Sequence, residues 1–460
     1  MSDNRRQSVL FPDLFSKPVQ AGFCRDQLST YGGTVLLSTR DRQLGLTEAL
    51  CAELNDGRQP GKVLHELLDQ MRQRLFGIAV GCADGNDAAK LRDDPMFKLA
   101  CDRDPAQGEA LASQPTLSRF ENAVRRTELL RMSRRLAETV IVGQARRRRG
   151  GQRPRRILID LDPTCDPTHG AQQLTFFNGY YRTWCYLPLV ITISFVGERR
   201  KYPVAAILRP GNAAPLLGVL PALRRLLALL RRHFPRTALY GRADAGFAAP
   251  ELFNFLDAEG LRYAVAMGSN TKLKELSACW MKLVRAMVQI HGQKVTLHRE
   301  TTYKAKRWRQ PHRLAYKAEV VVEEGKEPRD NARYVVAQMP GNYRAKGLFD
   351  FYYGHSDMEN TIKELKNVLE MDRTSCSRFQ ANQFRILLTL AAYVLMQSVQ
   401  EYSADEELQK AQMATLRDRL LLIGVQVRCS VRRVVLEFTR HHPWADAWLA
   451  CARSLGAVPV

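Results

Sequence analysis

The sequence contains no hydrophobic run long enough to span a lipid bilayer. Its two most apolar stretches, residues 216–230 and 386–399, are too short or too often interrupted by arginine, and both predict buried helices. The first residues, MSDNRRQSVLFPDLF, lack the apolar core and cleavage site of a secretory signal, and no lipidation motif opens the chain. We therefore expect a cytoplasmic protein that does not bind a membrane.

The sequence also lacks the common local motifs of hydrolases, zinc sites and nucleotide-binding proteins. It has no HExxH, no GxSxG and no GxGxxG after a strand, and its ten cysteines are scattered singly without a CxxC pair. Residues 57–63 (GRQPGKV) resemble a phosphate-binding loop, but one residue is missing between the glycines, and Val63 stands where a hydroxyl should bind magnesium. These absences exclude the usual nucleotide-binding and zinc-dependent functions.

Acidic residues are too few to balance the basic ones. Lys and Arg number 69 against 47 Asp and Glu, which gives a formal net charge of +22 at pH 7. The electric field of such a positive charge attracts polyanions. Nucleic acid is the commonest polyanionic partner, and its binding is favoured because each neutralised phosphate releases a counterion. With 460 residues, 45% of them hydrophobic, the chain can bury more than one core. We expect a folded protein that binds nucleic acid.

The N-terminal region is predicted to be helical. Between residues 46 and 142 apolar residues recur at intervals of three and four, as in VLHELLDQMRQRLFGIAV. The run RRRRGGQRPRR then places seven arginines in residues 146–156, and its glycines and proline cannot continue a helix. We place a domain junction there. The run is either a solvated linker or an arm in which Arg146, Arg147, Arg148 and Arg149 contact phosphates.

The middle of the chain predicts a mixed sheet covered by helices. Aliphatic and β-branched runs at residues 157–162, 186–196 and 203–208 predict three strands of a meander. An amphipathic helix, the strand TALYGRAD, a second helix and the strand RYAVAM follow, so the order is βββαβαβ. This order predicts an α/β fold.

A basic, hairpin-rich section follows residue 268, with strands expected in VTLHRETTY, LAYKAEVVVE and ARYVVAQM. Helical periodicity resumes at Phe349 and is followed by a mixed tail. The expected divisions are a mainly helical region that binds DNA ends (1–150), the first part of the sheet domain (151–267), a β-rich insertion (268–345), the closing helices (346–402) and a C-terminal region (403–460).

Four carboxylates occur where a sheet edge and a helix could meet. Asp160 and Asp162 alternate with aliphatic residues and point to one face at the end of a strand, and Asp244 ends a second strand. Glu359 shares a helix face with Lys363 and Lys366. Each has an ordinary alternative role: Asp162 could belong to a turn, Asp244 could cap a helix, and Glu359 could lie on a surface face of ion pairs. Together they predict a site for hard divalent cations that faces a polyanion, suited to phosphodiester chemistry.

With these carboxylates in view, the sequence resembles the DDE transposases of bacterial insertion sequences, specifically the IS1380 family, related to the IS4 group. The resemblance covers nearly the whole chain, and its marks are the segments beginning PGKVLHELLDQMRQRLFGIAV, LASQPTLSRFEN, DLDPTCDPTHGAQQ, FFNGYY, RADAGF and MENTIKELK. It implies an RNase H-like mixed sheet flanked by helices, with a β-rich insertion and a helical N-terminal region. It assigns Asp162, Asp244 and Glu359 as catalytic, metal-binding residues, with Asp160 and Asp166 competing for the first role.

The resemblance also implies partners and further site residues. A Tyr, Arg, Glu, Lys signature of related transposases corresponds here to Tyr352, His355, Glu359 and Lys366. Since histidine lacks the planar fork of arginine, a weaker and pH-dependent DNA contact is expected at His355. The implied cofactors are two Mg²⁺ or Mn²⁺ ions. The implied partners are double-stranded DNA with terminal inverted repeats and target DNA, bound by a homodimer associated with the bacterial nucleoid. Two other functions stay open, namely a DNA-binding protein without catalysis and a nuclease without strand transfer.

Overall fold

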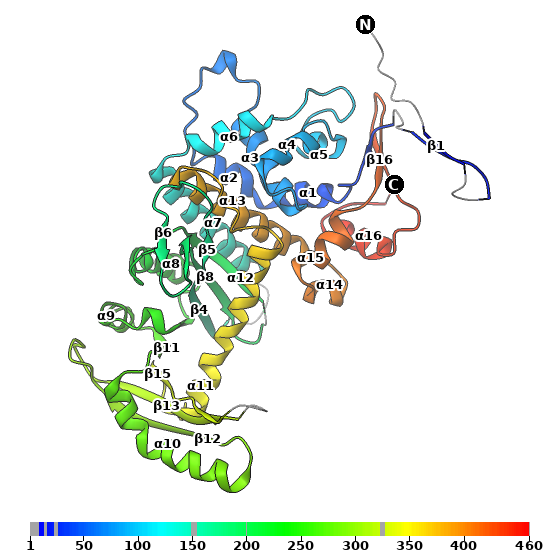
Figure 1. Ribbon diagram of the computed structural model, residues 1–460. Helices are drawn as coiled ribbons and strands as arrows, with labels where there is room; N and C mark the ends of the chain where they lie inside the picture. Colours follow the sequence, from blue (N-terminus) through cyan, green and yellow to red (C-terminus); the bar gives the residue numbers. More distant parts are fainter. Residues whose placement is uncertain are drawn as a thin grey trace.

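The computed structural model describes residues 9–12, 16–22, 26–148, 154–198, 200–322 and 327–459. Its helices and strands gather into three parts (Figure 1). N-terminal helices and the C-terminal segment lie at one end, a sheet with covering helices lies in the middle, and a helix with long strands forms the other end. The junction expected near residue 150 falls at residues 149–153, outside the described residues.

Among the described residues, nine strands form the large central sheet, in the order β12-β13-β15-β11-β10-β4-β8-β9 with β14 attached to β13. Three of the expected strands form the predicted meander, because β8 is antiparallel to both β4 and β9. Strands β10 and β11 are parallel to β4. The bounds are β4 Arg156–Pro163, β8 Leu189–Phe195, β9 Lys201–Ile207, β10 Ala238–Ala243 and β11 Arg262–Met267.

The core lies between this sheet and its helices. Every residue of β8 is buried, as expected of an aliphatic strand in the middle of a sheet. Helix α7 (Arg126–Arg147), helix α8 (Val219–His233) and helix α13 (Phe379–Gln400) supply apolar side chains to the same core. Residues 384–400 of α13 are all buried, which confirms the buried helix predicted there. The predicted α/β class, an RNase H-like mixed sheet flanked by helices, is confirmed.

The β-rich insertion extends the central sheet. Its strands β12 (Thr296–Tyr303), β13 (His312–Val321) and β15 (Arg333–Gln338) occupy the expected sequences, and β15 pairs antiparallel with β11. Helix α10 (Thr271–His291) was not expected. It packs Met281, Val284 and Val288 against β13 and ends at Gly292, whose φ of 63° suits glycine.

The N-terminal and C-terminal segments pack together. Strand β16 (Val425–Cys429) pairs with β17 (Val434–Phe438) and with β3 (Leu28–Ser29). Helices α1 (Thr34–Leu44), α3 (Leu67–Ala79) and α6 (Gln114–Ala123) surround one end of α13 (Figure 1). Within the described ranges no helix combines the length and apolarity needed to cross a membrane.

Candidate active site

Asp160 is the centre of a buried ion network on β4. Its neighbour on β10 is Arg242, whose Nε and Nη2 donate to the two carboxylate oxygens at 2.7 and 3.0 Å. Lys201 on β9 donates from Nζ at 2.6 Å, and Nδ1 of His355 lies 3.1 Å away. Burial alone would raise the pKa of Asp160, but the hydrogen bonds from His355 and Arg242 and the nearby cations hold it well below its ordinary value.

The same network fastens a helical segment to the sheet. Nη1 of Arg242 donates to the carbonyl of Phe351 at 2.8 Å, and Lys201 reaches the carbonyl of Gly354 at 3.4 Å. A Cβ atom at Gly354 would lie 2.5 Å from Arg242 Nη1, so a side chain there would push the guanidinium away. These contacts hold α11 (Ala345–Tyr353) and the turn Gly354–Ser356 against the sheet, and therefore set where α12 (Asp357–Asn367) begins.

Asp162 points to the same face as Asp160, two residues nearer the end of β4. It is half-buried, and none of the described residues donates a hydrogen bond to its side chain. Burial raises its pKa to about 7, and the nearby negative charges of Asp244, Glu359 and Asp160 contribute, although His355 opposes the rise. Burial therefore disfavours the charged form of Asp162, and no described residue donates a hydrogen bond that would offset this effect.

Asp244 follows β10 and lies two residues beyond Arg242, at the same edge of the sheet. Its carboxylate accepts a hydrogen bond from the backbone N–H of Gly246 at 3.0 Å and caps the short turn Ala245–Phe247. The capping role considered from the sequence is therefore real. Burial still raises the pKa of Asp244, despite the Gly246 hydrogen bond and the nearby His355.

Glu359 lies in the first turn of α12 and is exposed. Its negative charge contributes to the raised pKa of Asp162. Across the described residues no three His, Cys, Asp or Glu side chains are close enough to enclose one ion. The chemistry of the donors nevertheless fits a hard divalent cation, because carboxylate oxygens carrying unbalanced negative charge are the ligands such ions prefer.

The two competing aspartates lie deeper in the protein. Asp160 is already paired with cations, as described above. Asp166 is 0% exposed; Thr374 donates to one of its oxygens at 2.8 Å, and the other oxygen has no partner within the described chain. Burial raises the pKa of Asp166 to about 8, which favours its neutral form. Asp162 is therefore the best placed of the three to accept a ligand from solvent.

The remaining residues of the expected signature differ in their surroundings. Tyr352 is half-buried, and its ring stacks on His355 with centroids 6.2 Å apart. His355 is buried, with Nε2 lacking a hydrogen-bond partner among the described residues. Lys366 donates to the carbonyl of Cys165 at 2.8 Å and lies 3.3 Å from Asp372, whereas Lys363 is exposed. Of the basic residues Lys363 and Lys366 on α12, Lys363 is the exposed one.

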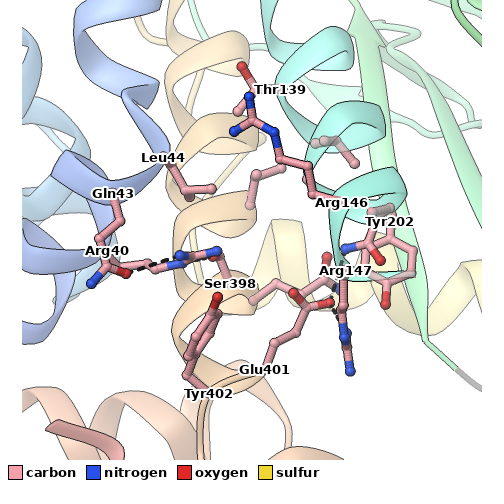
Figure 2. Close-up of a pocket in the computed structure, with 15 residues that line it drawn as sticks. Arg40, Gln43, Leu44, Thr139, Arg146, Arg147, Tyr202, Ser398, Glu401 and Tyr402 are labelled. Carbon is pink, nitrogen blue, oxygen red and sulfur yellow. Dashed lines mark hydrogen bonds and ion pairs between the residues drawn. The ribbon is translucent and has the colours of Figure 1, made fainter. Parts of the chain in front are cut away.

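The arginine run is largely engaged within the protein where it is described. Arg147 pairs with Glu401 at 2.6 Å, and Arg148 pairs with Glu198 and covers the ring of Phe195. Arg146 is exposed and lines a pocket of about 560 Å³ between α1, α7 and α13, where the Arg147–Glu401 contact is also visible (Figure 2). Arg149 lies outside the described residues.

Sequence reasoning missed the basic partners of Asp160. Arg242 lies within the apolar strand ALYGRA, and Lys201 begins the buried strand β9. A charged residue in a strand that is otherwise buried needs a partner, and this signal could have identified both residues. It could not have shown that they share one carboxylate.

Asp162→Asn is expected to stabilise the metal-free protein at pH 8. In the folded protein the pKa of Asp162 is raised to about 7, so the charged carboxylate destabilises the fold. This destabilisation is absent below about pH 4 and is fully developed above about pH 7. A rise of about three pKa units corresponds to about 4 kcal/mol. Because Asp162 is only half-buried, solvent reduces this cost, which comes mainly from burial and partly from the neighbouring carboxylates, so we expect about 2 kcal/mol in urea unfolding with a chelator.

Thermal unfolding with added divalent cations tests whether cations compensate the charge of Asp162. Mg²⁺ or Mn²⁺ should raise the Tm of the unsubstituted protein at pH 8 and raise that of Asp162→Asn much less. The exposed carboxylate of Asp93 provides the control, because Asp93→Asn should leave the cation response unchanged. An equal response of all three proteins would contradict the prediction.

The comparisons with known proteins identify the family of the chain and do not test the individual site residues. A family model described as Transposase DDE domain group 1 matches residues 11–459, which include β4, β10 and α12. No curated protein matches the chain with significance. The match does not distinguish the IS1380 family within the group, so that assignment stays a prediction. Because the match spans nearly the whole chain, the protein belongs to the DDE transposase family, whose members cleave and join DNA and typically use divalent metal ions.

Proposed function

We propose that this protein is the transposase of an insertion sequence of the IS1380 family, related to the IS4 group, and that it cleaves and joins DNA at the terminal inverted repeats. The observation that supports the proposal is the pair of carboxylates Asp162 and Asp244 at the ends of the neighbouring strands β4 and β10, where burial raises the pKa of both. In a chain with a net charge of +22, a local concentration of negative charge calls for bound cations.

The proposed chemistry is transesterification at a phosphodiester. Asp162, Asp244 and Glu359 would hold two Mg²⁺ or Mn²⁺ ions, which activate the attacking oxygen and stabilise the leaving one. Asp160 takes no part in binding them, since its oxygens are occupied by Arg242, Lys201 and His355. Its role is to hold the helical segment so that Glu359 faces the sheet edge.

Positive side chains on α12 are proposed to position the DNA. Lys363 lies one turn after Glu359 and points into solvent, where it can neutralise a phosphate. Tyr352 and Lys366 lie on either side of Glu359 along the chain and would fix the strand end. His355 would contribute through Nε2, which is buried and unpartnered within the described residues. We also propose that a homodimer holds both DNA ends.

A plasmid assay tests this function directly. The donor plasmid carries the inverted repeats that flank the reading frame, and the purified protein is supplied with Mg²⁺ or Mn²⁺ and a target plasmid. Nicks at the repeat ends followed by joined donor–target products are expected. Nicks without joined products would indicate a nuclease, and specific binding without nicks would indicate a DNA-binding protein that has lost catalysis.

Arg146→Gln is expected to weaken DNA binding similarly for all sequences. The plot of the logarithm of the DNA association constant against the logarithm of the salt concentration should become less steep by about 1. The reason is that Arg146 is exposed and has no ion pair with a described residue. Arg147→Gln is the matched control, because Arg147 is already paired with Glu401. Titrations at several salt concentrations measure both slopes. Equal slopes for the two variants would contradict a phosphate contact by Arg146.

A further inference from the structure

A hairpin near the end of the chain projects from the body of the molecule. Strands β16 and β17 form it, and we call residues 425–438 the C-terminal hairpin. It belongs to the part of the molecule that holds the N-terminal helices and the C-terminal segment, apart from β4 and β10, and its tip extends well beyond α16 (Ala445–Ser454) (Figure 1). A ligand of this hairpin would therefore be contacted away from the carboxylates.

The base of the C-terminal hairpin is fixed to the N-terminal part of the protein. Val425 and Val427 of β16 form a buried cluster with Met96, and Leu436 and Phe438 of β17 pack against it. Strand β16 also pairs with β3. Because the base is buried and paired in this way, the tip is presented from a rigid support, and little conformational entropy is lost when it binds a ligand.

The tip of the C-terminal hairpin is a tight loop of two residues, Val431 and Arg432. The backbone N–H of Ser430 donates to the carbonyl of Arg433 at 2.9 Å, and the Ser430 hydroxyl accepts a hydrogen bond from the backbone N–H of Arg433 at 3.2 Å. Val431 is the most exposed large hydrophobic residue in the described part of the chain. A single exposed apolar side chain is ordinary, so the charges around it decide what the tip can bind.

Arginine dominates the charge of this tip. Residues 428–441 contain four arginines and one carboxylate, Glu437. Glu437 pairs with Arg428 at 3.1 Å, whereas Arg432 and Arg433 are exposed and form no ion pair with a described residue. Two guanidinium groups without a carboxylate partner therefore project from a rigid, narrow support. Such a tip attracts an anionic partner.

The width of the tip fits the minor groove of DNA. Paired strands lie about 4.8 Å apart, whereas the minor groove of B-form DNA is about 6 Å wide and the major groove about 12 Å. Arginine enters the minor groove because its negative potential is strong where it is narrow, and apolar side chains often enter beside it. Val431 and Arg432 supply both kinds at the tip. A ribbon lying in the major groove would instead present the exposed Glu437, whose carboxylate repels phosphates.

We propose that the C-terminal hairpin inserts its tip into the minor groove of the bound duplex. Arg432 and Arg433 contact phosphates along the groove, and Val431 lies between its walls. This inference rests on the proposed function, because that function brings duplex DNA with terminal inverted repeats to the protein. Since the hairpin lies apart from β4 and β10, it contacts base pairs away from the cleavage position. Its residues are positioning residues and take no part in the chemical step.

Binding titrations of the full-length protein provide the first test, with Ca²⁺ in place of Mg²⁺ and duplex DNA that carries the flanking inverted repeats. The Arg432→Gln, Arg433→Gln double variant should bind about 10 to 100-fold more weakly, and its affinity should depend less steeply on salt, by about 2 in the logarithmic slope. Arg453→Gln is the control, because Arg453 is exposed on α16, off the hairpin, without an ion pair to a described residue. It should leave the slope unchanged. Equal slopes for the double variant and the control would overturn the proposal.

The second test identifies the groove. An iron chelate that cuts DNA through hydroxyl radicals is attached to a Val431→Cys, Cys429→Ser variant, and Cys429→Ser alone, treated in the same way, gives the background from the other cysteines. We expect cuts on the two strands that are offset towards their 3′ ends, the pattern of a reagent in the minor groove, at positions away from the nick. An offset towards the 5′ ends, which marks the major groove, or no cuts above the background would overturn the proposal.

Two further outcomes separate this proposal from other roles of the chain. A smaller mass of the DNA-free Arg432→Gln, Arg433→Gln variant in light scattering would overturn the proposal and assign the tip to contacts between subunits. Absence of nicking by the unsubstituted protein with Mg²⁺ would overturn the proposed function instead, since neither the titration nor the cuts made by the chelate depend on the protein's own cleavage of DNA.

Discussion

Replacing Asp162 or Asp244 by asparagine, or Glu359 by glutamine, should reduce nicking of end-containing DNA by about 10³-fold or more while DNA binding is retained. Bound ions supply several kcal/mol of transition-state stabilisation, and each 1.36 kcal/mol is worth a factor of ten in rate. The substitutions keep the shape of each side chain, so the fold should not change. Single-turnover nicking and gel-shift titration measure the two quantities.

Asp166→Asn is the matched control for this series. Asp166 is buried and its neutral form is favoured, and asparagine resembles a neutral carboxyl group, so nicking should continue at a rate close to that of the unsubstituted protein. Loss of nicking in Asp166→Asn together with normal nicking in Asp162→Asn would reverse the assignment of the first carboxylate. Normal nicking in all three triad variants would remove the basis of the proposed catalytic site.

Asp160→Ala is expected to lower the free energy of unfolding by about 3–5 kcal/mol, because it leaves buried cations without their partner. Arg242 and Lys201 have side chains only 5% and 4% exposed, so water cannot replace the carboxylate at little cost. Urea unfolding followed by circular dichroism measures the effect. Nicking should also fall, since the helical segment that carries Glu359 loses its attachment to the sheet.

A double-variant cycle distinguishes this network from simple loss of packing. Arg242→Met should also destabilise the protein, but adding it to Asp160→Ala should cost much less than the sum of the single changes, because the unpaired guanidinium is then absent. Strictly additive effects would show that Asp160 and Arg242 do not stabilise each other. A change below about 1 kcal/mol in Asp160→Ala would contradict a role in fastening α11 and α12.

The strands around the site could be predicted from sequence because each is a short aliphatic run between turn residues, as in β4, β8 and β11. Helix α10 escaped prediction although its buried residues recur at intervals of three and four. The polar Ser277 occupies one of these buried positions, and lysines and Arg285 lie between the others, so the apolar pattern is weak in the sequence. Strands β6 (Phe176–Asn178) and β7 (Thr183–Tyr186) were not predicted either, because Phe176, Phe177 and Trp184 are exposed aromatic residues that do not follow the pattern of a buried strand.

The positions of Asp162, Asp244 and Glu359 in their elements could also be predicted, since strand ends and a helical period are local properties. The difference between Asp160 and Asp162 could not. Both point to the same face of β4, and only the approach of Arg242, Lys201 and His355 from other elements separates a structural carboxylate from an available one. Burial of His355 depends on the same tertiary contacts.

The Asp160 network also has a consequence for the order in which the protein assembles during synthesis. Its members lie 41, 82 and 195 residues from Asp160 along the chain. Lys201 and Arg242 emerge from the ribosome early enough to pair with Asp160 while the sheet forms, but His355 and the following helix emerge much later. An incomplete nascent chain can therefore build the sheet edge with its two aspartates, yet it lacks the helix that carries Glu359. On the proposed function, the capacity to cut DNA would arise only near the end of translation.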